Sequence, residues 1–177
     1  TSVEQGMKKY KEKKYSEAIK HFARSINVNP QNYVSYLYIG KCYQNQKKYN
    51  RAYQFYTKAL DINSQYAKGY YHRGRLLGGF GRFDQAEKNL KKCLKLEPNN
   101  IRANYHLGHL YFRQNEYQNA IPYLSKTLKL NKKFGAGYYY LGVSQYHLNH
   151  PGPARKNLNN AKRLGFDQAA KFLKNHY

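Results

Sequence analysis

The histidines are the side chains of this sequence whose types and spacing come closest to a chemical site. His106 and His109 lie three residues apart, so they would share one face of a helix, and His72 and His147 could be brought near them. A metal site would also need a cysteine, an acidic ligand or a third aligned histidine, so we expect no metal. Protonation of such histidines below about pH 6.5 would instead strengthen anion binding.

The other reactive residue types form no catalytic constellation. Cys42 and Cys93 lie far apart in the sequence, at positions that pack within helices. This placement favours small buried thiols over a disulfide or a redox pair. The sequence also has no nucleophile elbow, no glycine loop that could bind phosphate and no paired carboxylates. We therefore expect neither enzyme activity nor a cofactor.

The elements that must position these side chains recur with a period of 34 residues. Two sets of small residues follow this period, the glycines Gly6, Gly40, Gly74, Gly108 and Gly142 and the alanines Ala18, Ala52, Ala86, Ala120 and Ala154. Small residues are needed where two helices touch closely, because a larger side chain would hold the backbones apart. Glycine inside a helix costs about 1 kcal/mol relative to alanine, so the packing that it permits must offset this cost.

The pattern predicts two helices in each repeated segment. In the second segment, we expect one helix from Tyr33 to about Gln46 and another from Asn50 to about Ile62, with a short polar turn between them. Apolar residues spaced by three and four place one face of each helix toward a core. One such place on the second helix of each segment is held by Phe22, Tyr56, Leu90, Leu124 and Leu158.

This pattern resembles the tetratricopeptide repeat, a helical hairpin of 34 residues that stacks into a solenoid. The resemblance covers the whole chain and implies an all-α, right-handed superhelix that forms a single domain over residues 1–177. The expected units span about residues 1–32, 33–66, 67–100, 101–134 and 135–168. A last helix over about residues 167–175 would cap the stack, with Asp167 as its N-cap and Ala169, Phe172 and Leu173 turned inward.

In this family the first helices of the units line a concave groove, so the resemblance assigns a candidate binding surface. The groove positions carry an aromatic, basic and histidine-rich set that would suit an extended peptide with acidic side chains. Some of these tyrosines could instead pack between neighbouring helices. The candidate peptide-binding residues are Tyr38, Lys41, Lys68, Tyr71, His72, Arg75, Arg102, Tyr105, His106, His109, Arg113, Tyr139, Tyr140 and His147.

The net charge is the second informative feature. The chain has 32 Lys and Arg against 9 Asp and Glu, a formal charge of +23. Residues 99–177 contain only two acidic residues, Glu116 and Asp167. Codon bias of an AT-rich genome explains part of the lysine content but not the shortage of glutamate. A field of this sign attracts acidic protein, nucleic acid or an anionic membrane surface.

We expect a non-catalytic protein-interaction scaffold that binds a protein partner with acidic segments and belongs to a larger complex. The acidic tails of tubulin are one such surface, and proteins of this family often serve ciliary assemblies, so a ciliary or cytoskeletal role follows by analogy. The alternative is a nucleic-acid or ribonucleoprotein component bound through the basic surface.

Neither a transmembrane run nor a signal-peptide pattern is present, and we expect the cytoplasm, with the cilium, the cytoskeleton or an organelle matrix as alternatives. The chain begins at Thr1 rather than Met, which is compatible with a piece of a longer protein or with a removed targeting segment.

Overall fold

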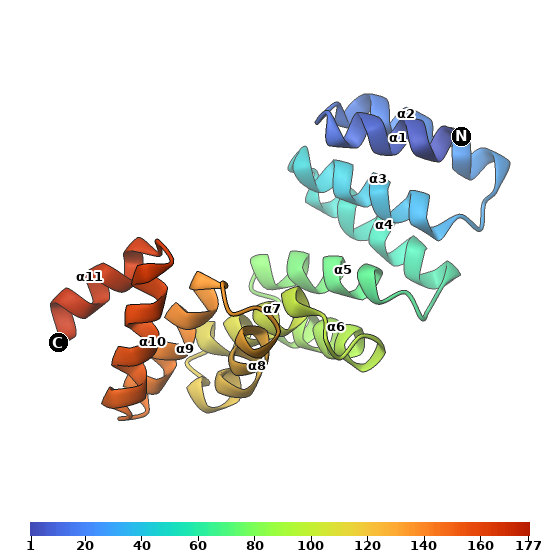
Figure 1. The fold of residues 1–177 in the computed structure, drawn as a ribbon. Helices are drawn as coiled ribbons and strands as arrows, with labels where there is room; N and C mark the ends of the chain where they lie inside the picture. Colours follow the sequence, from blue (N-terminus) through green and yellow to red (C-terminus); the bar gives the residue numbers. More distant parts are fainter. The chain divides into compact units, whose positions relative to one another are not determined.

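The computed structural model describes residues 1–177, and its regular structure is entirely α-helical, as the repeat pattern predicts (Figure 1). Its helices are α1 (Ser2–Lys11), α2 (Tyr15–Val28), α3 (Tyr33–Asn45), α4 (Tyr49–Ile62), α5 (Ala67–Gly79), α6 (Phe83–Leu96), α7 (Ile101–Arg113), α8 (Tyr117–Leu130), α9 (Gly135–His147), α10 (Pro151–Arg163) and α11 (Asp167–His176). The bounds of α3 and α4 differ from the expected ones by a single residue at one end of each helix. No helix has the length and apolar character needed to cross a membrane.

The helices pack as consecutive hairpins, α1 with α2 through α9 with α10. We name the first helix of each hairpin the A helix and the second the B helix. The A helices α3, α5 and α9 also pack against the preceding B helices α2, α4 and α8, respectively. Neighbouring A helices touch as well, α1 with α3 and α7 with α9. Helices α3, α5 and α9 therefore connect their hairpins to the preceding ones.

The turns within the hairpins share one backbone conformation. In the second hairpin, Lys47 adopts a left-handed φ of 61°, and the N–H of Lys48 donates to the carbonyl of Tyr43 at 2.8 Å. This hydrogen bond closes the end of the A helix in the manner of a Schellman motif. The residues in the left-handed region recur every 34 positions, namely Lys13, Lys47, Gly81, Asn115 and Asn149. The chain therefore reverses at the same place in every repeat.

The periodic glycines and alanines mark the place where the A helix and the B helix of one hairpin cross. A Cβ atom built on Gly40 would lie 2.6 Å from Cε1 of Tyr56 and 3.2 Å from the backbone oxygen of Ala52. Both distances are too short for a side chain, which is the physical reason for the repeated glycine. The side chains that a Cβ would meet at the other crossings are Phe22 for Gly6, Leu90 for Gly74, Leu124 for Gly108 and Leu158 for Gly142.

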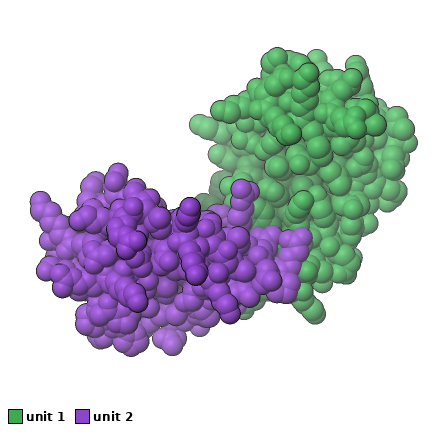
Figure 2. All heavy atoms as spheres, in the orientation of Figure 1, with its two compact units in different colours: residues 1–96 green, residues 97–177 purple.

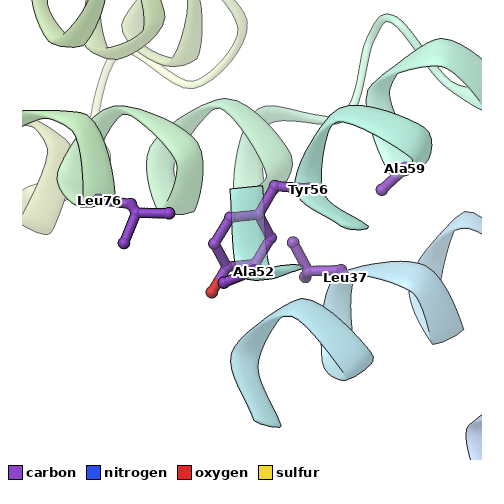
Figure 3. Packing of buried hydrophobic residues seen from close by; sticks show 5 residues of the cluster. All are labelled: Leu37, Ala52, Tyr56, Ala59 and Leu76. Atoms are coloured by element: carbon purple, nitrogen blue, oxygen red, sulfur yellow. The ribbon is translucent and has the colours of Figure 1, made fainter. Parts of the chain in front are cut away.

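The core around the second crossing shows how one hairpin binds to the next. The ring of Tyr56 lies between Leu37 of α3 and Leu76 of α5 and is fully buried (Figure 3). Its hydroxyl donates to Oε1 of Gln44 at 2.6 Å, so the buried phenol keeps a hydrogen-bond partner. Ala52 and Ala59 on the same face of α4 are also fully buried. One tyrosine of α4 therefore contacts both neighbouring helices, α3 and α5.

The chain packs as two compact units, residues Thr1–Leu96 and Glu97–Tyr177 (Figure 2). Unit 1 contains the first three hairpins, and unit 2 contains the last two hairpins and α11. The division falls between α6 and α7, at a boundary between repeats.

Helix α11 covers the last hairpin, as expected from its apolar residues. Ala169 is fully buried, and Phe172 and Leu173 pack against the cluster that contains Val143 and Leu158. The expected N-cap is wrong, because the N-cap residue is Phe166 and Asp167 is the first residue within the helix. A carboxylate in the first turn still interacts favourably with the helix dipole, so its placement remains consistent with a helix start.

Candidate functional site

The first cluster of candidate residues lies at the N-terminal end of unit 1. Lys41 places its Nζ atom 4.4 Å from the centre of the Tyr38 ring and 4.7 Å from that of Tyr10. The two rings meet edge to face at 5.5 Å. A cation over two rings is a favourable electrostatic arrangement that also fixes the lysine stem. Tyr38 and Lys41 are thus brought together, and Tyr10 of α1 joins them although the sequence analysis did not select it.

A second cluster in unit 1 surrounds Tyr56. The His72 ring stacks on Tyr56 at 5.7 Å and meets Tyr71 edge to face at 4.9 Å. Tyr71 is only 7% exposed, so this candidate packs inside the unit and offers little surface to a partner. The half-buried Arg75 lies on the same helix, and its Nε atom is buried without a hydrogen-bond acceptor. Lys68 is exposed in the first turn of α5.

In unit 2 the candidate residues form a continuous network of rings. Tyr105 stacks nearly parallel to His109 at 5.9 Å, and His109 lies 4.5 Å from Tyr140. Tyr140 contacts Tyr139 at 5.1 Å, and Tyr139 contacts Phe166 at 5.0 Å. These rings come from α7, from α9 and from the residue before α11. The structure therefore joins four of the predicted site residues across two A helices.

The same network contains rings that the sequence analysis did not place in the candidate site. Phe112 meets Tyr140 at 4.8 Å, Phe134 meets Tyr105 at 4.8 Å, and Tyr146 meets Phe172 of α11 at 5.2 Å. The repeat period could have indicated Phe134, because another aromatic residue, Tyr66, occupies the equivalent position two periods (68 residues) earlier. The apolar pattern of the capping helix predicted that Phe172 turns inward, but it did not place this ring beside the candidate residues.

The remaining histidines of the candidate set do not gather into one site. His106 contacts the edge of Tyr105 at 5.1 Å. His147 instead stacks on Tyr117 at 4.5 Å, with the two rings 5° from parallel. The structure contains no group of three or more His, Cys, Asp or Glu side chains arranged to hold a metal ion. His147, the last residue of α9, therefore packs against the start of α8 and does not join the pair His106 and His109.

Burial and positive charge control the titration of the ring network. Burial, aided by the positive charge of Arg113, lowers the pKa of His109 below its ordinary value of 6.5. Burial raises the pKa of Tyr140, against the opposing effects of a hydrogen bond from Tyr105 and of the Arg113 charge. The expectation that the groove histidines become protonated below about pH 6.5 is therefore wrong for His109, which keeps its neutral form to lower pH.

Positive side chains border this neutral network. Arg102 and Arg113 are exposed at the two ends of α7. The three carboxylates of unit 2 lie elsewhere, at or beside helix starts: Glu97 accepts from Asn100, Glu116 accepts from Asn119, and Asp167 begins α11. Unit 2 therefore contains few negative side chains that would compete with an acidic ligand.

The cysteines offer no reactive thiolate. Cys42 and Cys93 are both fully buried in helices of different hairpins. Burial raises the pKa of the Cys42 thiol to about 12, so this side chain stays protonated at neutral pH.

Two family models match parts of this chain. The model described as "Regulator of microtubule dynamics protein 1-3" matches residues 5–72, and the model described as "Tetratricopeptide repeat" matches residues 79–133. No curated protein matches the sequence. The two matches together fall within the hairpins described above, and the second supports the resemblance that the 34-residue period indicated.

Solved structures with the same fold are similar over nearly the whole chain. A crystal structure of MamA is 23% identical, with a TM-score of 0.81 over 93% of this chain and 96% of that chain. YrrB, described as a tetratricopeptide-repeat protein with an unusual peptide-binding site, is 16% identical, with a TM-score of 0.80 over 98% and 90% of the two chains. PilF of Pseudomonas aeruginosa is 19% identical, with a TM-score of 0.83 over 95% and 74%. At these identities the similarity establishes the fold alone.

Proposed function

We propose that this chain, a tetratricopeptide-repeat protein, is a non-catalytic interaction scaffold whose A helices bind an acidic, extended segment of a protein partner. Tetratricopeptide repeats generally serve protein–protein interaction, and members of both matched families are typically non-catalytic. The observation that carries the proposal is the ring network of unit 2, which joins α7, α9 and α11 and is bordered by the exposed Arg102 and Arg113. Rigid rings supply apolar contact, and arginines bind carboxylates through paired hydrogen bonds.

Unit 1 supports the same kind of ligand on its own A helices. Lys41 is held over two tyrosine rings, so its position is defined before a ligand arrives. Arg75 keeps a buried Nε atom without an acceptor, and a buried donor of this kind gains most from an added carboxylate oxygen. Each unit therefore contains an aromatic surface with at least one cation that could anchor an acidic side chain.

A microtubule-associated role is the more specific form of this proposal. The family model that matches residues 5–72 is named for regulators of microtubule dynamics, and the tails of tubulin are acidic. A formal charge of +23 would favour association with such a surface through long-range attraction. Cytoskeletal or ciliary assemblies are accordingly the first place to search for the partner.

The decisive experiment compares charge reversals on and off the A helices. Arg102→Glu with Arg113→Glu should weaken binding of a fluorescent peptide of alternating Glu and Tyr by roughly tenfold or more. Lys162→Glu with Arg163→Glu is the matched control, because it changes the net charge equally on exposed residues of the B helix α10. Equal losses of peptide affinity in both double variants, with helicity retained, would show that net charge rather than the A helices governs binding.

Nucleic acid is the second candidate partner, favoured by the scarcity of acidic residues after position 98. A pull-down from the source cells at about 0.1 M and 0.5 M salt, with and without nuclease, separates the two classes of partner. Binding to nucleic acid should fall steeply with salt, by roughly 0.9 log units per phosphate contact for each log unit of salt on duplex DNA. Protein partners that survive both treatments would support the scaffold, and partners lost with nuclease would support the second candidate.

A further inference from the structure

Unit 1 contains a surface pocket away from the candidate residues of the A helices. Its volume is about 620 Å³, and its lining residues are Tyr49, Asn50, Tyr53, Gln54, Leu76, Leu77, Phe80 and Arg82. The floor is apolar, because Leu76 and Leu77 are nearly buried at 5% and 4% exposure. The walls are aromatic, with Tyr49 and Tyr53 each 37% exposed and Phe80 56% exposed. Large apolar side chains left open around a pocket commonly mark an interaction site.

The pocket lies where the third repeat departs from the pattern of the second and fourth. Tyr43 and Tyr111 occupy the place of Leu77 in those repeats, and each packs its ring against a ring of its own B helix. The two ring pairs are Tyr43 with Phe55 at 5.4 Å and Tyr111 with Tyr123 at 5.8 Å. In the third repeat, Leu77, which lines the pocket, takes the place of the tyrosine, and Asn89, which accepts from Nε of Arg73 at 2.9 Å, takes the place of the partner ring. The ring pair is therefore absent, and the pocket lies beside the smaller Leu77.

Phe80 is a second departure at the same place. The corresponding residues are Gln46 and Gln114, and Gln46 donates to the hydroxyl of Ser16 on the preceding B helix at 3.0 Å. Phe80 cannot make this polar bridge, and its ring instead meets Tyr49 edge to face at 5.1 Å. An apolar wall therefore replaces the hydrogen bond that closes the equivalent place between α2 and α3.

The border of the pocket is positively charged. Arg82 lines the pocket, and a neighbouring hollow of about 430 Å³ shares Tyr49, Asn50 and Phe80 with it. That hollow adds Lys47, Lys48 and Arg51. Neither hollow has an acidic residue in its lining. The apolar pocket therefore contains one cationic side chain, and the adjoining hollow supplies three more.

The pocket is distinct from the proposed A-helix site. Successive residues of a helix are turned by about 100°, so Leu77 faces away from His72 and Arg75 on helix α5, whereas Leu76, four residues after His72, lies on nearly the same side as that histidine. The other wall of the pocket comes from the B helix α4, which contributes Tyr49 and Tyr53. A ligand could therefore occupy the pocket without contacting the candidate residues His72 and Arg75.

We propose that this pocket is a second docking site, for a protein segment that inserts one bulky apolar side chain between Phe80 and Tyr53 and places acidic residues on either side of it. The apolar floor would desolvate the inserted side chain, which is the usual origin of a binding hot spot. Lys47, Lys48, Arg51 and Arg82 would bind the flanking carboxylates and select against neutral or basic segments. With two sites, one chain would link two different acidic partners, or two segments of one partner.

The test uses the whole chain and two fluorescent peptides, one with a single Phe between runs of Asp and Glu and one with Ala in place of that Phe. The unaltered protein should bind the Phe peptide roughly tenfold more tightly than the Ala peptide. Leu77→Tyr restores the residue of the second and fourth repeats and should reduce the affinity for the Phe peptide to that for the Ala peptide. Phe80→Gln, which introduces the residue found in the second and fourth repeats, should also lower the affinity for the Phe peptide, without unfolding the protein.

A control variant keeps this proposal separate from the proposed function. Arg102→Glu with Arg113→Glu should leave the preference for the Phe peptide unchanged, even if it abolishes A-helix binding. Equal affinity for both peptides in the unaltered protein would overturn the second site, as would a Leu77→Tyr variant that retains the preference. Loss of self-association in Leu77→Tyr, with peptide binding intact, would assign the pocket to a second copy of this chain and would likewise overturn the proposal.

Discussion

Gly40 lies directly against the ring of Tyr56, so closely that a Cβ atom on the glycine would stand 2.6 Å from Cε1 of the tyrosine. The contact joins the A helix and the B helix of one hairpin, and the same contact recurs in every hairpin with Phe or Leu as the partner. The stability of the repeat therefore depends on a glycine that helix propensity alone would disfavour.

Replacement of Gly40 by alanine should destabilise the protein by about 1–3 kcal/mol, because the neighbouring backbone and a buried ring must move apart. The matched control is Gly79→Ala, since no atom lies within 4 Å of a Cβ at that position. The control should be neutral or more stable by up to about 1 kcal/mol. Urea unfolding followed by circular dichroism measures both, and equal effects would refute the close contact as the cause.

The left-handed turns predict a stabilising substitution. Lys47 has a φ of 61°, and asparagine adopts this conformation more readily than lysine, as Asn115 and Asn149 do at the same place in later repeats. Lys47→Asn should raise the free energy of unfolding by roughly 0.5–1 kcal/mol. The neighbouring Lys48 has a φ of −88°, so Lys48→Asn should bring no such gain. Thermal unfolding at one salt concentration compares the two, and a gain in the control would point to charge instead.

Two substitutions at Tyr56 distinguish how much ring packing and how much the hydrogen bond contribute to the free energy of unfolding. Tyr56→Ala removes a fully buried ring and should cost about 3–5 kcal/mol. Tyr56→Phe keeps the ring but removes the hydroxyl that donates to Gln44, and should cost about 1 kcal/mol. Chemical denaturation gives both values. Peptide affinity of the folded Tyr56→Phe variant should stay unchanged, and a large loss of affinity there would mean that Tyr56 contributes to the binding surface.

The lowered pKa of His109 predicts how the free energy of unfolding depends on pH. Its pKa is lowered in the folded protein, so the unfolded chain binds this proton at higher pH and stability falls as pH is lowered through about 6.5. The loss should level off below the pKa of the folded state. His109→Phe keeps a ring between Tyr105 and Tyr140 and should reduce this loss.

The measurement is the free energy of unfolding at about pH 7.5 and about pH 5.5 for both proteins. His150→Phe serves as the control, because His150 is exposed at the N-cap of α10. If the control variant flattens the pH dependence as much as His109→Phe, buried His109 is not its source.

Much of the candidate site could be located in the sequence, but not the state of each residue. The repeat placed Tyr38 with Lys41 and Tyr105 with His109 on A helices, where the structure has them. It could not show that Tyr71 is buried at 7% exposure, since that depends on how closely the next hairpin approaches. The network also draws in Phe166 and Phe172 near the chain end, where the capping helix interrupts the repeat period.

The helices, their turns and the small residues at their crossings could be predicted from the repeat, because it imposes the same local geometry on each segment. Which rings are open to solvent and which are packed depends on how neighbouring helices approach one another. The pocket beside Leu77 illustrates the difference, since a leucine at an apolar position reads as ordinary core. The pocket becomes visible only when α4 and α5 are in place, with Leu77 where the second and fourth repeats have a tyrosine.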